Sequence, residues 1–520
     1  MLLDNSAGMP IVTLPIAEWA PDLFPPGSAG AATITNVVPR TPTTYGPMPS
    51  ATAYSAALSA RCIGSYTMRD TGNNVFVFAG DQTKLYLLKA GSTSFADVSG
   101  AAYTGAPWPD TQWSFTSYGL RVVAANYNDN LQTYLVGTDT VFSDLTTLRA
   151  KFCAAVGDFV MIANTFDGTN GAQPQRAWWS AIGDPTSWPT PGTLAAIQVQ
   201  SDYQDLQQTD LGQITGLVAG PLPAASATIF CEHGVYTALY VGSPAIFSFK
   251  VADGAPGCAS PHSIVRGHIN SGGAIVPVIF YRAPDGFYAF NGTSATPIGA
   301  NKFDRFVLGE LDSRSAATVI GSQDSLNKLV FWAYSTTASP QLYDRMLCYN
   351  WDINRASYID LTTAPIEALV DTATIGYTLD ELDQFGTLDT LPYSLDSEAW
   401  VGGSPRFGVF DSSHQLAYFT GNNMAVTVET PEVEPIPGSR VFIRNSRPLV
   451  DGTGGSVALS LRERTVDATT LKTAVAMNAM GECPQRYTGR YVKARFTYPA
   501  NTSFTHIQGI ELDITKQGIR

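Results

Sequence analysis

Residue types that often carry out chemistry are sparse here, and their spacing does not favour catalysis. The five histidines (His233, His262, His268, His414 and His506) show no HxxxH or HExxH spacing, so metal-assisted hydrolysis has no support. The sequence has no GxSxG nucleophile turn and no GxxxxGK[ST] phosphate loop. We expect His262 and His268 to be surface side chains of a loop. The sequence therefore predicts no catalytic residue, no cofactor and no enzyme activity.

The six cysteines are widely spaced. Cys62, Cys153, Cys231, Cys258, Cys348 and Cys483 form no CxxC pair, which argues against a zinc site and against a redox motif. We expect them to be small buried apolar residues in a reducing compartment.

One short stretch, RAWWSAIGDPTSW (Arg176–Trp188), places three tryptophans around a Gly-Asp-Pro turn. A sialidase Asp-box has the order Ser-x-Asp-x-Gly-x-x-Trp, but here Ser180 is followed by Gly183 and only then by Asp184. We interpret the stretch as a structural hairpin motif in which Trp178, Trp179 and Trp188 pack around the turn and Asp184 accepts hydrogen bonds from turn amides. A sugar-stacking site remains the functional alternative.

A second stretch is rich in carboxylates. Residues 361–405 contain eight acidic residues and no Lys or Arg, and Leu-Asp recurs at 379–380, 382–383, 388–389 and 395–396. The close alternation of ligands that a Ca²⁺ site requires is not clear. We therefore expect a solvated acidic excursion from the fold.

Composition and charge exclude several classes of protein. Charged residues make up only 14% of the 520 residues, and the net charge is −13, so the protein as a whole is not a nucleic-acid clamp. Residues 431–520 contain twelve Lys/Arg and eight Asp/Glu, a net charge of +4, which leaves −17 on residues 1–430. No apolar run is long enough to span a bilayer, and the N-terminus lacks the pattern of a secretory signal. We expect no membrane anchor.

A hairpin unit recurs along the chain at intervals of roughly 40–50 residues. Each unit is an apolar or aromatic run, a polar turn and a second run rich in Tyr or Phe. Such units begin at Val75, Gly119, Gly157, Thr228, Val276, Lys328 and His414. This interval, with almost no helical periodicity, predicts an all-β fold in which six or seven blades form a β-propeller. Two stacked β-sandwiches are the alternative.

The elements also suggest domain boundaries. We expect an N-terminal arm and strand region at 1–60 and a propeller at 61–430, with insertions near 184–225 and 361–405. The prolines of ETPEVEPIPGSR then precede a small C-terminal β-domain at 431–520. In RYVKARFTY, Tyr491, Lys493, Arg495 and Thr497 should face one side of a strand. Val492, Ala494, Phe496 and Tyr498 should face the other.

Several stretches in this order resemble the tail hub or nozzle proteins of short-tailed bacteriophages, also described as tail tubular protein B or packaged-DNA stabilisation proteins. These are the N-terminal NVVPRTPTTYGP, the Arg176–Trp188 stretch, GFYAFNGTSATPIGANKFDRF, the Leu-Asp repeats before Trp400, and the closing TGRYVKARFTYPANTSFTHIQGIELDITKQGIR. The resemblance extends over nearly the whole chain and rests on structural motifs, so it implies assembly and no catalytic residues.

The resemblance implies a structural virion protein, assembled in the host cytoplasm and located in the tail. It would form a homohexameric ring below the head-to-tail adaptor and contact tail fibre, spike or needle proteins. Its channel would retain and eject genomic DNA without binding it specifically. Asp380, Asp383, Asp389 and Asp396 are the candidate channel-facing acidic residues. Arg440, Arg444, Arg447, Arg462 and Arg464 are the candidate assembly residues, expected to meet an acidic neighbouring surface.

Two other functions stay open at this point. Exposed Trp and Tyr side chains also stack on sugars, so a carbohydrate-binding propeller or adhesin is the alternative. A glycosidase is the third possibility, although no convincing pair of catalytic carboxylates is visible.

Overall fold

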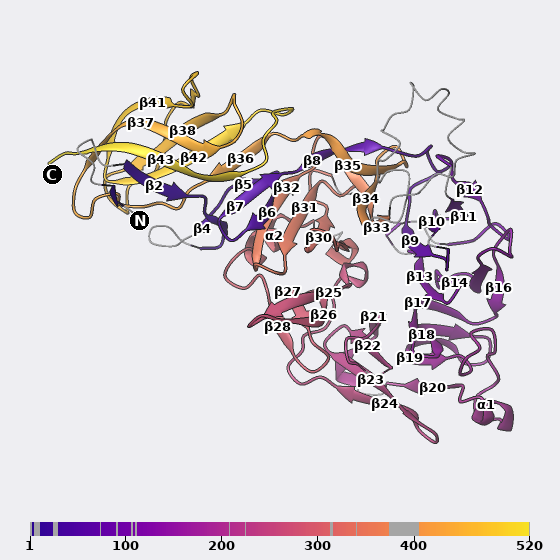
Figure 1. Ribbon diagram of the computed structural model, residues 1–520. Helices are drawn as coiled ribbons and strands as arrows, with labels where there is room; N and C mark the ends of the chain where they lie inside the picture. The colour runs from indigo at the N-terminus through magenta and orange to yellow at the C-terminus, as the bar shows by residue number, and fades with distance from the viewer. Residues whose placement is uncertain are drawn as a thin grey trace, which may run out of the picture.

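The computed structural model describes residues 3–4, 11–23, 30–72, 74–89, 92–105, 108–109, 112–206, 209–223, 225–312, 316–339, 341–373 and 405–518. Figure 1 shows a ring of small sheets, coloured purple to orange along the chain, with a second body beside it. This second body combines yellow C-terminal strands with indigo N-terminal strands. Among the described residues, no helix is long and apolar enough to cross a membrane.

The ring is a β-propeller, and the described residues form seven four-stranded blades of antiparallel strands. Blade 1 is β9 (Gly64–Arg69), β10 (Val75–Gly80), β11 (Leu85–Leu88) and β12 (Ala96–Asp97). Blade 2 is β13 (Ser114–Tyr118), β14 (Arg121–Ala125), β15 (Leu131–Leu135) and β16 (Ser143–Thr146). Blade 3 is β17 (Arg149–Val156), β18 (Phe159–Asp167), β19 (Gly171–Trp179) and β20 (Asp202–Asp205). Blade 4 is β21 (Ile214–Ala219), β22 (Ser226–Cys231), β23 (Val235–Gly242) and β24 (Ile246–Val251).

The remaining blades complete the circle. Blade 5 is β25 (Val265–Ser271), β26 (Ala274–Ala283), β27 (Gly286–Phe290) and β28 (Ala295–Pro297). Blade 6 is β29 (Ile320–Asp324), β30 (Leu329–Tyr334), β31 (Arg345–Asn350) and β32 (Arg355–Asp360). Blade 7 is β33 (Ile366–Ala373), β34 (Pro405–Asp411), β35 (Leu416–Asn423) and β8 (Pro49–Ala53). The predicted all-β propeller is therefore confirmed, with seven blades.

The last blade closes the ring with a strand from the other end of the sequence. β8 pairs antiparallel with β35, where Thr52 lies opposite Tyr418. The innermost strands β33 and β9 are then neighbours around the axis. Because a propeller blade buries its faces only against adjacent blades, this strand exchange joins the first and last blades by hydrogen bonds.

Separate apolar clusters fill the spaces between adjacent blades. Between blades 1 and 2, for example, Phe78 packs edge-on against Tyr134 and Phe142, with ring centroids 5.5 and 5.8 Å apart. The polar hairpin turns lie outside these clusters. Gly157 (φ +57°) occupies the turn between β17 and β18, where a backbone with positive φ suits the twist of a two-residue hairpin.

The second body is a β-sandwich built from both ends of the chain. One sheet contains β1 (Leu3–Asp4), β2 (Ile11–Pro15), β43 (Ile507–Lys516), β37 (Val441–Val450) and β41 (Cys483–Gly489), joined by β6 (Val37–Thr41) and β7 (Thr44–Pro47). The other contains β5 (Ile34–Thr35), β36 (Val426–Glu429), β42 (Tyr491–Tyr498), β38 (Ser456–Arg462), β39 (Thr470–Leu471) and β40 (Val475–Ala476). β5 also pairs with β32, so this second sheet continues into blade 6.

This arrangement differs from the expected division at 60 and 430. The N-terminal strand β2 pairs with β43 along its whole length, so residues 1–60 and 431–520 do not form separate units. The proline-rich stretch expected to mark the domain boundary is hydrogen-bonded into the sandwich. Thr430 donates its N–H to Ala494, and Val433 exchanges two backbone hydrogen bonds with Val492. The alternation expected in RYVKARFTY is confirmed, because β42 alternates between half-buried and buried residues.

Three short elements connect the two bodies. β3 (Glu18–Trp19) pairs with β4 (Gly30–Ala31), and α2 (Asp304–Glu310) lies between blades 5 and 6. Trp19 stacks on Phe303 with ring centroids 5.5 Å apart and meets Phe306 edge-on at 5.6 Å. Asp22 accepts the backbone N–H groups of Arg305 and Phe306 at the start of α2. The N-terminal segment is therefore fastened to the propeller by both aromatic packing and charge-assisted hydrogen bonds.

Candidate functional site: the axial cavity

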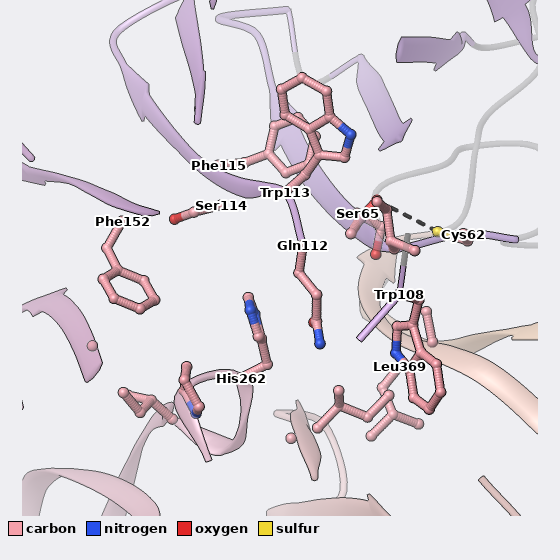
Figure 2. A pocket seen from close by; sticks show the side chains of 18 of the residues that line it. Cys62, Ser65, Trp108, Gln112, Trp113, Ser114, Phe115, Phe152, His262 and Leu369 are labelled. Atoms are coloured by element: carbon pink, nitrogen blue, oxygen red, sulfur yellow. Dashed lines mark hydrogen bonds between the residues drawn. The ribbon is translucent and has the colours of Figure 1, made fainter. Parts of the chain in front are cut away.

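A cavity of about 280 Å³ lies on the propeller axis. Its walls are formed by the innermost strands of the blades and by the loops that precede them, including the short η2 helix (Pro261–Ser263) before blade 5. Figure 2 shows the side chains that line it. In propellers the axis is the place where residues far apart in the sequence meet, so this cavity is the candidate site.

Glycines allow the innermost strands to approach one another. A Cβ atom at Gly64 would lie 2.6 Å from the carbonyl oxygen of Trp113 on the next blade. A Cβ at Gly216 would lie 2.2 Å from Ile264, and one at Gly321 would lie 2.5 Å from Val265. The narrow axis therefore depends on residues without side chains at these positions.

Two polar side chains project into the cavity. Figure 2 shows Gln112 and His262 in the middle of the view, with Phe152 on one side and Trp108 on the other. The imidazole of His262 retains some accessible surface, but it is removed from bulk water, and this desolvation lowers its pKa from 6.5 to about 4. The ring is therefore neutral at physiological pH and can both donate and accept one hydrogen bond.

The expectation that His262 is a surface residue is thus wrong, whereas His268 is exposed. No local pattern distinguishes the two histidines. His262 faces the axis because η2 leads directly into the innermost strand of blade 5, and this can be known only once the ring closes.

The carboxylate nearest the cavity is already engaged. Glu367, 5% exposed, accepts the backbone N–H of Cys62 at 3.3 Å and lies 2.9 Å from Nδ1 of His414. Burial raises the pKa of the Cys62 thiol to about 12, so the thiolate needed for nucleophilic attack is not formed at neutral pH. All six cysteines are buried and free of disulfides, as expected.

Arg61, in the segment that enters blade 1, contacts residues of blades 6 and 7. Its guanidinium lies 4.0 Å from the ring centroid of Trp108 and 5.7 Å from that of Tyr343, a cation–π arrangement. It also donates to the backbone carbonyls of Gln341 and Glu367. This contact holds blades 6 and 7 against the segment that enters blade 1.

The axial cavity therefore offers a defined shape and hydrogen-bonding groups, namely a neutral imidazole, an amide and a paired carboxylate. Among the described residues, no group of three His, Cys, Asp or Glu side chains could hold a metal ion.

The structure places the Arg176–Trp188 stretch at the outer part of blade 3. Trp178 and Trp179, 7% and 2% exposed, point to opposite faces of β19 because successive strand residues alternate. Trp178 packs on Tyr203 (centroids 5.2 Å apart) in the interface with blade 2. Trp179 packs on Phe247 (5.1 Å) in the interface with blade 4.

The turn that follows carries Asp184 and Trp188. Asp184 accepts the backbone N–H and the hydroxyl of Thr186 at 2.9 and 2.6 Å, which hold its pKa below the usual range. Trp188 is half-buried, and its indole donates to the carbonyl of Pro185. The stretch therefore supports two blade interfaces and a turn.

Sequence analysis overlooked Arg176, which begins this stretch. Its guanidinium is 4% exposed and contacts Asp205 at 2.6 Å and Asp167 at 3.1 Å, while Tyr203 lies under it at 3.7 Å. A buried arginine requires carboxylate partners. Asp167 lies 9 residues before Arg176 and Asp205 lies 29 residues after it, so no local sequence pattern connects the three.

No tryptophan among the described residues has an exposed side chain, so none provides an open aromatic platform for a sugar. The described residues therefore offer no exposed tryptophan, which is the feature on which the sugar-stacking alternative rested. The four aspartates expected to face a channel, Asp380, Asp383, Asp389 and Asp396, lie outside the described residues.

The five candidate assembly arginines do not share one face. Arg462 is 7% exposed and pairs with buried Glu432, and Arg440 pairs with Glu463 at 2.8 Å. Arg444 and Arg447 project from β37 on the outer face of its sheet, where Arg447 approaches Glu482 at 3.9 Å. Arg464 is exposed in the loop after β38. Arg462 is therefore buried, whereas Arg440, Arg444, Arg447 and Arg464 retain accessible side chains.

Comparisons with known proteins bear on the fold. No protein-family model matches the chain, and no curated protein matches it. Among solved structures, YCF48 bound to D1 peptide is similar at 9% identity and a TM-score of 0.36, covering 71% of this chain and 97% of that chain. YCF48 from Cyanidioschyzon merolae is similar at 10% identity and a TM-score of 0.38, covering 71% and 98%. BBS1N in complex with ARL6DN is similar at 10% identity and a TM-score of 0.28, covering 56% and 80%.

Proposed function

We propose that this β-propeller protein is a structural subunit of the tail of a short-tailed bacteriophage, where copies form the hub or nozzle ring below the head-to-tail adaptor. The observation that carries the proposal is the continuous hydrogen-bonded sheet that runs from the sandwich through β5 into blade 6. A subunit of a fixed ring must hold its two bodies at one angle, and a shared sheet does this better than a flexible linker.

The size of the axial cavity shows where a DNA channel could not lie in the proposed ring. A space of about 280 Å³ has the size of a small-molecule pocket, so duplex DNA cannot pass along the propeller axis. In the proposed ring, the DNA channel therefore lies between copies of the chain. Its partners would be further copies of itself, the adaptor, and fibre, spike or needle proteins, and its location would be the virion tail.

The charge distribution suits a channel that DNA traverses. Residues 1–430 carry a net charge of −17, and a surface of that sign repels phosphates and does not retain them. Arg440 and Arg462 are engaged by carboxylates of their own domain, so the basic C-terminal region does not present one broad cationic surface.

Electron microscopy of the purified chain in negative stain tests the proposal directly. We expect closed rings of six copies, with a central lumen and with propellers at the periphery. Scattered monomers at concentrations well above those of assembly in a cell would contradict it. Joint replacement of Arg444 and Arg447 by Gln should abolish the rings and change the melting temperature little, because both side chains are exposed. Arg266→Gln, an exposed arginine of blade 5, is the matched control and should leave the rings intact.

A further inference from the structure

A second pocket of about 310 Å³ lies where blades 6 and 7 meet the strand that arrives from the sandwich. Its walls come from β6 and the start of β8, from the turn between β29 and β30, and from β34 and β35. In Figure 1 these strands converge where the ring meets the sandwich. The pocket shares no lining residue with the axial cavity.

Its floor is a column of three phenylalanines. The ring centroids of Phe331 and Phe407 are 4.3 Å apart with an interplanar angle of 15°, and those of Phe407 and Phe419 are 5.4 Å apart at 7°. Phe331 and Phe407 are buried, whereas Phe419 at the end of the column is partly exposed. Leu326, on the rim, is 68% exposed. An accessible aromatic surface beside an exposed leucine is unusual for a solvent-facing turn.

Two arginines flank this apolar floor. Arg406 lies over the ring of Tyr418 at 5.8 Å, and Arg40 donates to the side-chain carbonyl of Asn327 at 3.4 Å. Neither guanidinium is within ion-pair distance of a carboxylate among the described residues. The carboxylate that lines the pocket, Asp324, is occupied by the N–H groups of Asn327. Within the described part of the chain, the pocket therefore combines an apolar floor with two arginines that no described carboxylate pairs with.

We propose that this pocket binds an acidic peptide segment of a partner protein. A leucine or aromatic side chain of the segment would pack on the phenylalanine column beside Leu326. Neighbouring Asp or Glu side chains would reach Arg40 and Arg406. Guanidinium groups bind carboxylates through paired hydrogen bonds, and an apolar centre with a charged rim is the usual composition of a protein interface. The inference does not depend on the proposed ring.

A nucleic-acid strand could also use stacked aromatics and arginines, but the charge argues against it. Binding of a polyphosphate chain requires several cations along its path, and the surroundings of this pocket belong to the part of the chain that carries −17. A carboxylate segment needs only the two cations present. The peptide is therefore the favoured occupant, and a strand of DNA or RNA becomes an outcome of the test.

The probe is a short fluorescein-labelled peptide of alternating leucine and aspartate, measured by fluorescence anisotropy with the full chain. We expect saturable binding that weakens as salt is raised, because the arginines lie at a solvent-exposed rim. The double variant Arg40→Gln, Arg406→Gln should bind about ten-fold more weakly, and Phe419→Ala should also lose affinity. Arg266→Gln, an exposed arginine on blade 5 outside this pocket, is the matched control and should bind as the unmodified chain does.

Two further peptides separate the contributions. Alternating leucine and asparagine keeps the apolar side chains without charge, and alternating serine and aspartate keeps the charge without them; both should bind more weakly. Equal binding of all three peptides, absence of binding, or equal affinity of the double variant would overturn the proposal. Preferential binding of a single-stranded oligonucleotide would overturn it in favour of a nucleic-acid site. Circular dichroism of each variant establishes that a lost affinity does not reflect unfolding.

Discussion

At the scale of single residues, the adjacent tryptophans show how one dipeptide serves two interfaces. Trp178 and Trp179 project to opposite faces of β19, and each fills the space between blade 3 and a different neighbour. The indole N–H of Trp179 also donates to the carbonyl of Gln200, in the segment that follows α1 (Leu194–Gln198). Adjacent large side chains are therefore an efficient way to position a blade on both sides.

Replacing Trp179 by Ala should lower the free energy of unfolding by about 3–5 kcal/mol, because it removes a buried ring and leaves a cavity beside Phe247. The measurement is denaturant unfolding followed by circular dichroism. Trp188→Ala is the control and should cost less, since that side chain is only half-buried. A Trp179 variant with unchanged stability that loses a bound ligand would refute the structural interpretation of this motif.

A second residue-scale prediction concerns Asp304. Its carboxyl is 7% exposed and enclosed by Gly286 and Gly299, and burial raises its pKa from 3.8 to about 7, with Asp22 and Asp285 adding repulsion. Between these pH values the folded chain holds a proton that the unfolded chain has released. The contribution of Asp304 to stability is therefore complete below about pH 3.8 and is lost as the pH rises through about 7.

Asp304→Asn should remove this dependence. The unfolding free energies of the variant and of the unmodified chain are compared from pH 4 to pH 7. The lowered pKa of His262 makes stability rise with pH over part of that range, whereas the raised pKa of Asp304 makes it fall. The difference between the two chains isolates the effect of Asp304. The difference between the two chains should favour the Asn variant increasingly as the pH rises. A constant difference would contradict the raised pKa. Asp253→Asn, at an exposed aspartate after blade 4 that is not among the groups acting on Asp304, is the matched control.

At the scale of elements, strands that are distant in sequence complete both bodies. β8 closes blade 7, and β2 completes the sheet that contains β43 and β37. Both come from the first 60 residues, which therefore belong to the folded core of each body. The N-terminal region thus acts as a fastening between the propeller and the sandwich.

Leu14→Ala tests this shared sandwich. Leu14 lies opposite Ile510 in the register, is 2% exposed, and should cost about 2–5 kcal/mol when truncated. Thr13, its exposed neighbour on the same strand, should cost less than about 0.5 kcal/mol when replaced by Ala. Denaturant unfolding of the full chain measures both. Equal effects would mean that β2 does not contribute to the sandwich core.

These elements also show where sequence analysis succeeds and fails. The hairpins beginning at Val75 or Gly119 are visible because apolar runs and turn residues are local signals. The partner of a strand is not local: PSATA in β8 has no large apolar side chain, so nothing in the sequence predicts that it completes blade 7. For the same reason, the sequence did not decide between six and seven blades, and it did not reveal that His262 would lie at the axis.

At the scale of the whole molecule, the two bodies share one continuous sheet and the charge is unevenly distributed along the chain. Several C-terminal cations are paired within the fold: Lys493 and Arg495 both contact Glu429, which is fully buried, and Arg490 contacts Glu434. A sequence region with a net positive charge therefore does not necessarily form a positively charged surface. This difference matters for whether the molecule binds DNA.

We expect the unmodified chain to show no binding of duplex DNA at physiological salt, because a net charge of −13 repels phosphates. Fluorescence anisotropy with a labelled duplex measures this, and tight binding would contradict the proposed channel.

Joint replacement of Asp380, Asp383 and Asp389 by Lys reverses charge in the Leu-Asp segment, and in assembled particles it should leave the ring intact while slowing DNA ejection. The same particles with Asp253→Lys, an exposed aspartate after blade 4, provide the control for an added cation elsewhere. If ejection proceeds at the normal rate in the triple variant, the Leu-Asp segment does not face the DNA, and the channel surface must be sought among other residues.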